Sequence, residues 1–510
     1  MLKLKPYDII GFTHYIMRDF IIFEVIMKKK KSIVLNYIYN ASYQVLTIII
    51  PLITTPYLSR VLKADGIGTY SATASIVAFF TLFAALGTII YGNREISYVS
   101  SDRELRSRTF WEIEILSIIT DSVCLIAYLI FLYFCNEDFS IYAIQIFSLL
   151  SIAANVSWLF QGMEDFRKVT IRNTIFKLLS VVFIFVFVKS KSDLFLYVAG
   201  LVILDFLNNL SIWFYLPKYI DKPDWKNLHP LRHLGPTFAL FVPTIASSIY
   251  TIFDKTMLKF FTDTSFENGY YEQALKLSKT ALTLITALEA VMIPRIGALF
   301  SANKKKEMTS LLYQSYRFVL MLGFPLCFGL IGIAYNFVPW FYGDGYDSVK
   351  YLLIILSFLI PIIGLSNVTG IQYLITTRRE NIVSITVTIG AICNIILNLI
   401  LIPKMYSYGA AISSVFAELL ITALQMFYVR KEISSLKVFT SSWKYLFASI
   451  LMLALLVFEN NFLTSSILNT FVMIFSGVVL YTFVLLSLRD EALLIVVKFI
   501  SKKISLFNKK

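Results

Sequence analysis

The chain contains little charge for its length and almost no histidine or cysteine. Charged side chains make up 15% of its 510 residues and hydrophobic ones 57%, whereas soluble domains carry about 25% charged residues. The four cysteines form no CxxC pair, so neither a disulfide framework nor a zinc site is indicated. His229 and His233, two of the three histidines, have i, i+4 spacing but no cysteine or carboxylate close by in the sequence. We expect them to be interfacial residues rather than metal ligands.

Motifs for nucleotide binding and for hydrolytic catalysis are also missing. The sequence has no GxxxxGK[ST] loop and no GxGxxG segment opening a helix, and it lacks HExxH and GxSxG. ATP hydrolysis by this chain is therefore not expected. We predict no cofactor and no metal, and these absences favour transport over catalysis.

Long apolar runs recur from one end of the chain to the other, and the mean hydropathy is +0.73. A helix of about 20 apolar residues crosses the roughly 30 Å hydrocarbon core of a bilayer. The sequence therefore predicts an all-α, polytopic membrane protein with about 14 transmembrane helices. These are expected at 34–59, 68–92, 110–134, 140–162, 169–188, 193–216, 236–260, 270–294, 310–334, 348–374, 381–402, 408–429, 443–459 and 465–488.

The net charge of +14 lies mainly in short loops on one side of this layout. Loops on the side of the N-terminus hold 20 lysines and arginines, and the opposite loops hold 5. Basic loops remain in the cytoplasm, so both termini of this multi-pass plasma-membrane protein are expected there. The charge thus reflects topology, and no nucleic-acid partner is predicted.

A short internal similarity suggests how the spans are grouped. Asn155-Val156 precedes Gln161-Gly162, and Asn367-Val368 precedes Gln372 at nearly the same interval, each late in a span. Matching spans 4 and 10 predicts a repeat of six helices, an arrangement that is common in transporters. The expected parts are a cytoplasmic segment 1–32, a first lobe 33–220 (helices 1–6), a second lobe 221–440 (helices 7–12), helices 13–14 at 441–490 and a basic cytoplasmic tail 491–510.

The first 26 residues carry only a modest apolar patch, and Met27 is followed by four lysines, Lys28 to Lys31. We hypothesise that translation starts at Met27. The alternative is an amphipathic helix that lies on the membrane surface. A peptide from residues 5–18 in the native protein would contradict the first hypothesis.

Charged residues inside the predicted spans cluster in spans 7 and 8. Each costs about 2.5–3.5 kcal/mol at the centre of a membrane helix, so such residues usually face a protein-lined or water-filled cavity. Lys255 and Lys259 share one helix face, as do Glu272 and Lys276. This cationic excess predicts a cavity for an anionic group such as a diphosphate. The alternative is that Asp254–Lys255 and Glu272–Lys276 pair within the bundle.

Several segments between residues 33 and 440 resemble the oligosaccharide flippases of the MOP exporter superfamily. They are NYIYN (36–40), PLITTPYLSRVL (51–62), GIGTY (66–70), YGNREI (91–96), WLFQGMEDF (158–166), FDKTML (253–258) and GYY (269–271). The chain departs from the family pattern at Lys63-Ala64, where a glycine often precedes the acidic residue.

The resemblance implies two pseudo-symmetric six-helix lobes plus two C-terminal helices in a bacterial inner membrane. It also implies outward movement of undecaprenyl-diphosphate-linked repeat units of O-antigen, capsule or exopolysaccharide by alternating access. The expected partners are this lipid-linked oligosaccharide, membrane lipids, and the polysaccharide polymerase and chain-length proteins.

The residues and the resemblance together define a candidate site. The predicted headgroup contacts in the cationic cavity are Arg60, Lys177, Lys255, Lys259, Lys276 and Arg295. Asp254 and Glu272 are predicted to bind an ion or to pair with these cations.

Two other functions are alternatives to a flippase. A MATE-like ion-coupled exporter of small molecules would need a net acidic cavity, whereas spans 7 and 8 are basic. A membrane-embedded polysaccharide polymerase usually has one large extracytoplasmic loop, which this chain lacks.

Overall fold

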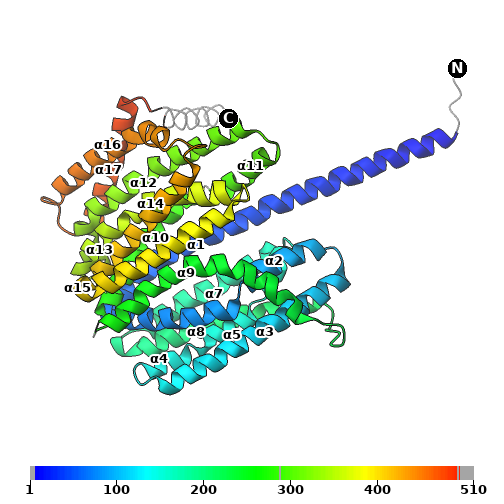
Figure 1. Cartoon of the computed structure of the whole chain (residues 1–510), viewed down its shortest axis with the longest axis horizontal. Helices are drawn as coiled ribbons and strands as arrows, with labels where there is room; N and C mark the ends of the chain where they lie inside the picture. The colour runs from blue at the N-terminus through cyan, green and yellow to red at the C-terminus, as the bar shows by residue number, and fades with distance from the viewer. Residues whose placement is uncertain (1–5, 263, 287–288, 491–492, 494–510) are drawn as a thin grey trace.

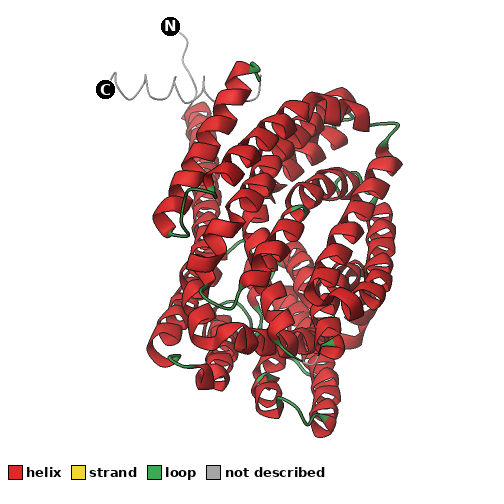
Figure 2. Cartoon of the chain, turned by 90° about the vertical axis from the view of Figure 1, so that its left-hand side faces the viewer, coloured by secondary structure: helices red, strands yellow, loops and turns green. Residues whose placement is uncertain are grey.

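The computed structural model describes residues 6–262, 264–286, 289–490 and 493. It is 86% helical, and the described residues contain no β-strand, which confirms the prediction of an all-α polytopic membrane protein (Figure 2). The helices are α1 (Pro6–Ala85), α2 (Thr88–Val99), α3 (Arg103–Phe134), α4 (Phe139–Ile144), α5 (Ile146–Ala154), α6 (Ser157–Gly162), α7 (Phe166–Phe187), η1 (Lys191–Asp193), α8 (Leu194–Ser211), η2 (Ile212–Lys218), η3 (Pro230–His233), α9 (Leu234–Phe261), α10 (Phe266–Thr286), α11 (Glu289–Ser301), α12 (Lys305–Tyr342), α13 (Asp347–Ser357), α14 (Leu359–Asn367), η4 (Val368–Ile375), α15 (Glu380–Val429), α16 (Ser435–Glu459) and α17 (Ile467–Ser487).

Ten stretches of the described chain are long and apolar enough to cross a membrane. Two of them, Val45–Val99 and Glu380–Val429, have 55 and 50 residues, which at 1.5 Å per residue is more than twice the thickness of a bilayer core. A residue with non-helical backbone angles interrupts the long helix in each stretch, Lys63 in the first and Tyr406 in the second, and the first stretch also turns at Leu86 and Gly87. Each stretch is therefore long enough for two crossings. The helices α9 and α10, which correspond to two further predicted spans, are not among the ten stretches.

The N-terminal part of α1 extends beyond the bundle (Figure 1). The backbone of residues 6–32 continues the first span as one helix instead of forming a separate element. The hypothesis of a start at Met27 concerns translation, so it stays a prediction.

The helices pack in two groups that correspond to the two halves of the sequence (Figure 1). In the N-terminal half, up to η2, α3, α5, α7 and α8 pack on one another and on α1. In the C-terminal half, from η3 onward, α12 packs on α13 and α14, and α15 packs on α9, while α16 and α17 cover α12. The halves meet where α1 contacts α9, α10 and α12. This junction holds most of the polar residues discussed below.

Two matching turns lie in the segments that suggested a repeat. Glu164 and Arg378 both have φ 60°, a left-handed conformation that commonly ends a helix. In each turn, the next residue donates its backbone N–H to the carbonyl five residues earlier, at 2.8 Å in both cases. The same geometry also ends helices at Asn303 and at Arg489, so it is a common helix ending in this chain, and the six-helix repeat stays a prediction.

Candidate substrate pocket at the junction of the two halves

An ion pair joins the first two helices of the C-terminal half inside the bundle. Lys255 of α9 contacts Glu272 of α10, and both side chains are partly exposed. Ser71 of α1 donates a hydrogen bond to Glu272 Oε2 at 3.0 Å. The structure thus pairs Glu272 with Lys255 rather than with Lys276, the partner that helix spacing suggested. The pair links α9 and α10 to a helix of the N-terminal half.

Three more lysines lie around this pair. Lys276 donates to Thr55 Oγ1 of α1 at 3.0 Å, and Lys177 of α7 is close enough to interact with Lys276 electrostatically. Lys279 lines the same pocket and is exposed. The sequence had placed Lys279 in span 8, but it was not among the predicted headgroup contacts.

The pocket formed here has a volume of about 250 Å³ and contains residues of α1, α9 and α10. Three lysines and one glutamate line it, so these four side chains carry a net charge of +2. An ammonium group in a membrane protein is stabilised by water or by anionic partners. Glu272 can neutralise only one of the three lysine side chains in this pocket. A phosphate group would supply the missing negative charge, since lysine binds phosphate as a compact point charge. We call this the Lys–Glu pocket.

Arg60 is placed elsewhere by the structure. Its guanidinium group donates to the carbonyl of Phe341 at 3.1 Å and also to the carbonyl of Trp340. These carbonyls lie in the last turn of α12, where backbone oxygens have no partner within the helix and attract cations. Arg60 therefore joins α1 to the end of α12 and does not line the Lys–Glu pocket.

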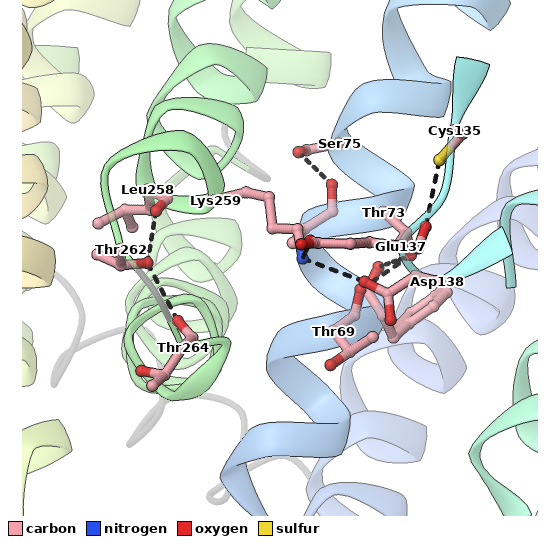
Figure 3. A network of polar contacts seen from close by, with 12 residues as sticks. Thr69, Thr73, Ser75, Cys135, Glu137, Asp138, Leu258, Lys259, Thr262 and Thr264 are labelled. Atoms are coloured by element: carbon pink, nitrogen blue, oxygen red, sulfur yellow. Dashed lines mark hydrogen bonds and ion pairs between the residues drawn. The ribbon is translucent and has the colours of Figure 1, made fainter. Parts of the chain in front are cut away.

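Lys259 lies one helical turn beyond Lys255 but points to a different partner. Its Nζ lies 3.1 Å from Asp138 Oδ2 and 3.6 Å from Glu137 Oε2. Figure 3 shows the side chain reaching from α9 across α1 to the loop between α3 and α4. Lys259 is thus neutralised by carboxylates of the N-terminal half and does not line the Lys–Glu pocket.

The other predicted contact outside the pocket is Arg295. It is exposed on α11, which packs on α12 and η4, and it is not a lining residue of the Lys–Glu pocket. From the predicted set, the structure therefore brings together Lys255, Lys276 and Glu272 in this pocket. Lys177 lies near Lys276 but does not line the pocket, and Arg60, Lys259 and Arg295 are separated from it.

Asp254 is fully enclosed within the C-terminal half. Its Oδ2 accepts a hydrogen bond from Tyr271 at 2.6 Å and another from Ser414, and its Oδ1 accepts one from Asn398 at 2.6 Å. The structure therefore provides hydroxyl and amide donors where the sequence had suggested Lys255. Within the described ranges, no three His, Cys, Asp or Glu side chains are placed to hold a metal ion.

The end of the junction away from the basic loops is closed by contacts between the two halves. Ser59 of α1 donates to the carbonyl of Tyr342 at 2.8 Å, and Tyr346 donates to the carbonyl of Ser59 at 3.2 Å. Two glycines allow α1 and α10 to touch through their backbones. A Cβ on Gly68 would lie 1.7 Å from the Ser265 oxygen, and a Cβ on Gly269 would lie 2.1 Å from the Ala64 oxygen.

At the basic-loop end, the linker between the halves is attached to α3. Glu112 is buried and accepts hydrogen bonds from the backbone N–H of His229 at 3.0 Å and from His233 Nε2 at 2.9 Å. His233 Nδ1 lies 2.6 Å from the Tyr91 hydroxyl. No carboxylate lies close to these histidines in the sequence, but the fold brings one to them, Glu112, which is more than 100 residues away.

Comparison with known structures identifies the class of fold. The chain superposes on an inward-closed structure of the lipid II flippase MurJ with a TM-score of 0.71 and 17% identity, over 90% of this chain and 99% of that one. An inward-facing multidrug resistance MATE family transporter of the MOP superfamily gives a TM-score of 0.58 and 14% identity, over 76% of this chain and 99% of that one. The fold is therefore one that membrane flippases and exporters share.

Sequence comparison identifies the family within this class. The family described as "Polysaccharide biosynthesis protein" matches residues 33–300, more than half of the chain, and the chain belongs to this family. A protein of Escherichia coli K12, provisionally named an O-antigen transporter, is 25% identical over 422 residues, which are 79% of this chain and 98% of that protein. The resemblance predicted from the sequence is thus confirmed, and a transporter rather than an enzyme is indicated.

Proposed function

We propose that this protein is a flippase that moves undecaprenyl-diphosphate-linked oligosaccharides from the cytoplasmic to the outer face of a bacterial plasma membrane. The observation that carries the proposal is the Lys–Glu pocket, where Lys255, Lys276 and Lys279 meet at the junction of the two halves around a single glutamate. Family membership and the name of the E. coli relative support a polysaccharide precursor as the cargo.

The charge of the pocket favours this function over export of small cations. MATE-like exporters share the fold, so the fold alone does not separate the two functions. A cationic substrate would be repelled by the lysines, whereas a diphosphate would be attracted. In the proposed mechanism, the diphosphate binds the pocket lysines Lys255, Lys276 and Lys279, and Lys177 adds positive charge nearby, while the polyprenyl chain remains in the lipid.

Movement across the membrane is proposed to occur by alternating access. The contacts of Arg60 and Lys259 between the halves would hold the far end closed while the pocket is reached from the basic-loop side. Their separation would open that end for release. In this scheme Arg60 and Lys259 are positioning residues of the closed end, and Asp254 is a candidate binding site for a coupling ion.

The proposal is tested by following the sidedness of the lipid-linked intermediate. We expect deletion of the gene to abolish surface polysaccharide and to leave the intermediate on the inner face, where enzymes added outside spheroplasts cannot modify it. A plasmid copy should restore outer exposure. If the deletion strain exposes as much intermediate as the parent, this protein is not the flippase.

A further inference from the structure

A second pocket, with a volume of about 660 Å³, lies between α7 and the region where α8 continues into η2. It shares no lining residue with the Lys–Glu pocket, and the proposed function does not use it. Its charged side chains are Asp165, Arg167, Lys168 and Arg172, and Ser211 and Tyr215 add hydroxyl groups. We call it the Arg172 pocket.

Arg172 is buried, with 7% of its surface exposed. Its Nε and Nη2 donate to Asn173 Oδ1 at 3.3 and 2.9 Å, but its Nη1 has no hydrogen-bond partner among the described residues. Asp205 of α8 and Tyr43 of α1 interact with it only electrostatically. A buried N–H without an acceptor costs about 1–3 kcal/mol, so an anionic oxygen reaching this group would be strongly favoured.

The remaining charges leave the pocket cationic. Lys168 donates to Asp165 Oδ2 at 2.7 Å, and its Nζ lies 4.2 Å from the centre of the Tyr219 ring. This lysine is therefore neutralised. Arg167 is exposed and forms no ion pair within the part of the chain that the structure describes. Neither guanidinium group forms a direct ion pair with a carboxylate in the described part of the chain, and Asp205 acts on Arg172 only through its charge. A guanidinium group matches the charge and the hydrogen-bonding geometry of a phosphate.

The edge of the pocket is apolar and exposed. Ile175 is 51% exposed and Phe214 is 84% exposed, and Ile171 and Tyr215 lie beside them. On helices that cross a membrane, exposed aliphatic side chains face lipid, and aromatic ones gather at the level of the headgroups. The opening therefore lies where a lipid can place its headgroup against Arg172 and keep its chains in the bilayer.

We propose that the Arg172 pocket binds the phosphate group of an anionic membrane lipid from the leaflet on the basic-loop side. Basic pockets between transmembrane helices on that side bind phosphate headgroups in other membrane proteins. Phospholipids and polyprenyl phosphates share this chemistry, and a free phosphate ion shares only the charge. Binding at this pocket does not require that the bound lipid is also the transported one.

The test measures the thermal unfolding of the full-length protein in detergent by intrinsic fluorescence. The added probes are dioleoylphosphatidylglycerol, undecaprenyl phosphate, inorganic phosphate and a neutral galactolipid. We expect a phosphate-bearing lipid to raise the unfolding temperature of the wild type, whereas the galactolipid and inorganic phosphate should not. The relative shifts with phosphatidylglycerol and undecaprenyl phosphate then show which lipid is preferred.

Four variants make the test specific. The lipid-induced rise in unfolding temperature should be lost in Arg172→Gln and should fall at least twofold in Arg167→Gln. It should persist in Arg430→Gln, a matched control. Arg430 is exposed and lies over the Phe427 ring at the end of α15. If Arg172→Gln does not fold, the exposed Arg167 decides the question. A full shift in the pocket variants, or an equal shift with inorganic phosphate, would overturn the proposal. Lys276→Gln should leave these shifts intact even if it abolishes transport, so this test is independent of the proposed flippase function.

Discussion

Replacing Gly269 by alanine should weaken the closed end of the junction. An alanine Cβ at this position would lie 2.1 Å from the carbonyl oxygen of Ala64, whereas real Cβ atoms keep at least 3.0 Å from their neighbours. The obstacle is the backbone of α1, not a flexible side chain, so the two helices must separate by about 0.9 Å, the difference between these distances. Overpacking of this kind costs about 1–3 kcal/mol. If the strain is relieved by opening, the ratio of open to closed protein rises about 5- to 150-fold.

Labelling of a cysteine placed at Ser59 measures this shift. Ser59 is fully buried and bonded to Tyr342 when the end is closed, so Ser59→Cys should react with a membrane-impermeant maleimide only in the open state. We expect Gly269→Ala to raise the labelling rate above that of Ser59→Cys alone. The control is Gly235→Ala, because a Cβ there would meet no other atom within 4 Å. A labelling rate equal to the control in a well-folded Gly269→Ala protein would refute the reasoning.

Two further substitutions test the other polar contacts of the junction. Glu272→Gln removes the partner of Lys255 and makes the net charge of the Lys–Glu pocket more positive by one unit. Inorganic diphosphate should therefore bind about tenfold more tightly, as measured by calorimetry. A change of this size is expected for one unit charge at about 8–10 Å in a partly screened site. An unchanged affinity would show that the diphosphate binds elsewhere. Glu112→Gln weakens the attachment of His233, and we expect it to destabilise the protein by about 1–3 kcal/mol and to speed protease cleavage of the linker at 222–228. Wild-type resistance to cleavage would show that this attachment does not restrain the linker.

The spans and part of the pocket were predictable because a lipid environment imposes simple rules on sequence. Apolar length marks a crossing, and a charge within an apolar run stands out because it is costly there. Lys255, Lys276 and Glu272 were identified in this way. Helix spacing could not identify the pairing, because Lys276 shares a face with Glu272 while Lys255 reaches it from the neighbouring helix.

The positions of Arg60 and Lys259 depend on groups that carry no signal in the sequence. Arg60 binds backbone carbonyls about 280 residues away, and any helix end presents such carbonyls. Lys259 shares a face with Lys255, but the rise of one helical turn, about 6 Å for four residues, is enough to bring it to the acidic loop instead of the pocket. Small hydroxyl residues such as Thr55 were missed because a threonine in a membrane helix usually bonds only its own backbone.

We propose that the lysines of the Lys–Glu pocket carry the diphosphate of the lipid-linked oligosaccharide across the membrane. The most direct measurement uses purified protein in liposomes that contain this lipid, and follows the fraction that a glycan-modifying enzyme outside can reach with time. The wild-type protein should equilibrate the lipid between the two leaflets. A Lys304→Gln control should do the same, because Lys304 is an exposed lysine that pairs with Glu307. Lys276→Gln should slow the exchange at least tenfold. Exchange at the wild-type rate in a well-folded Lys276→Gln protein would contradict the account.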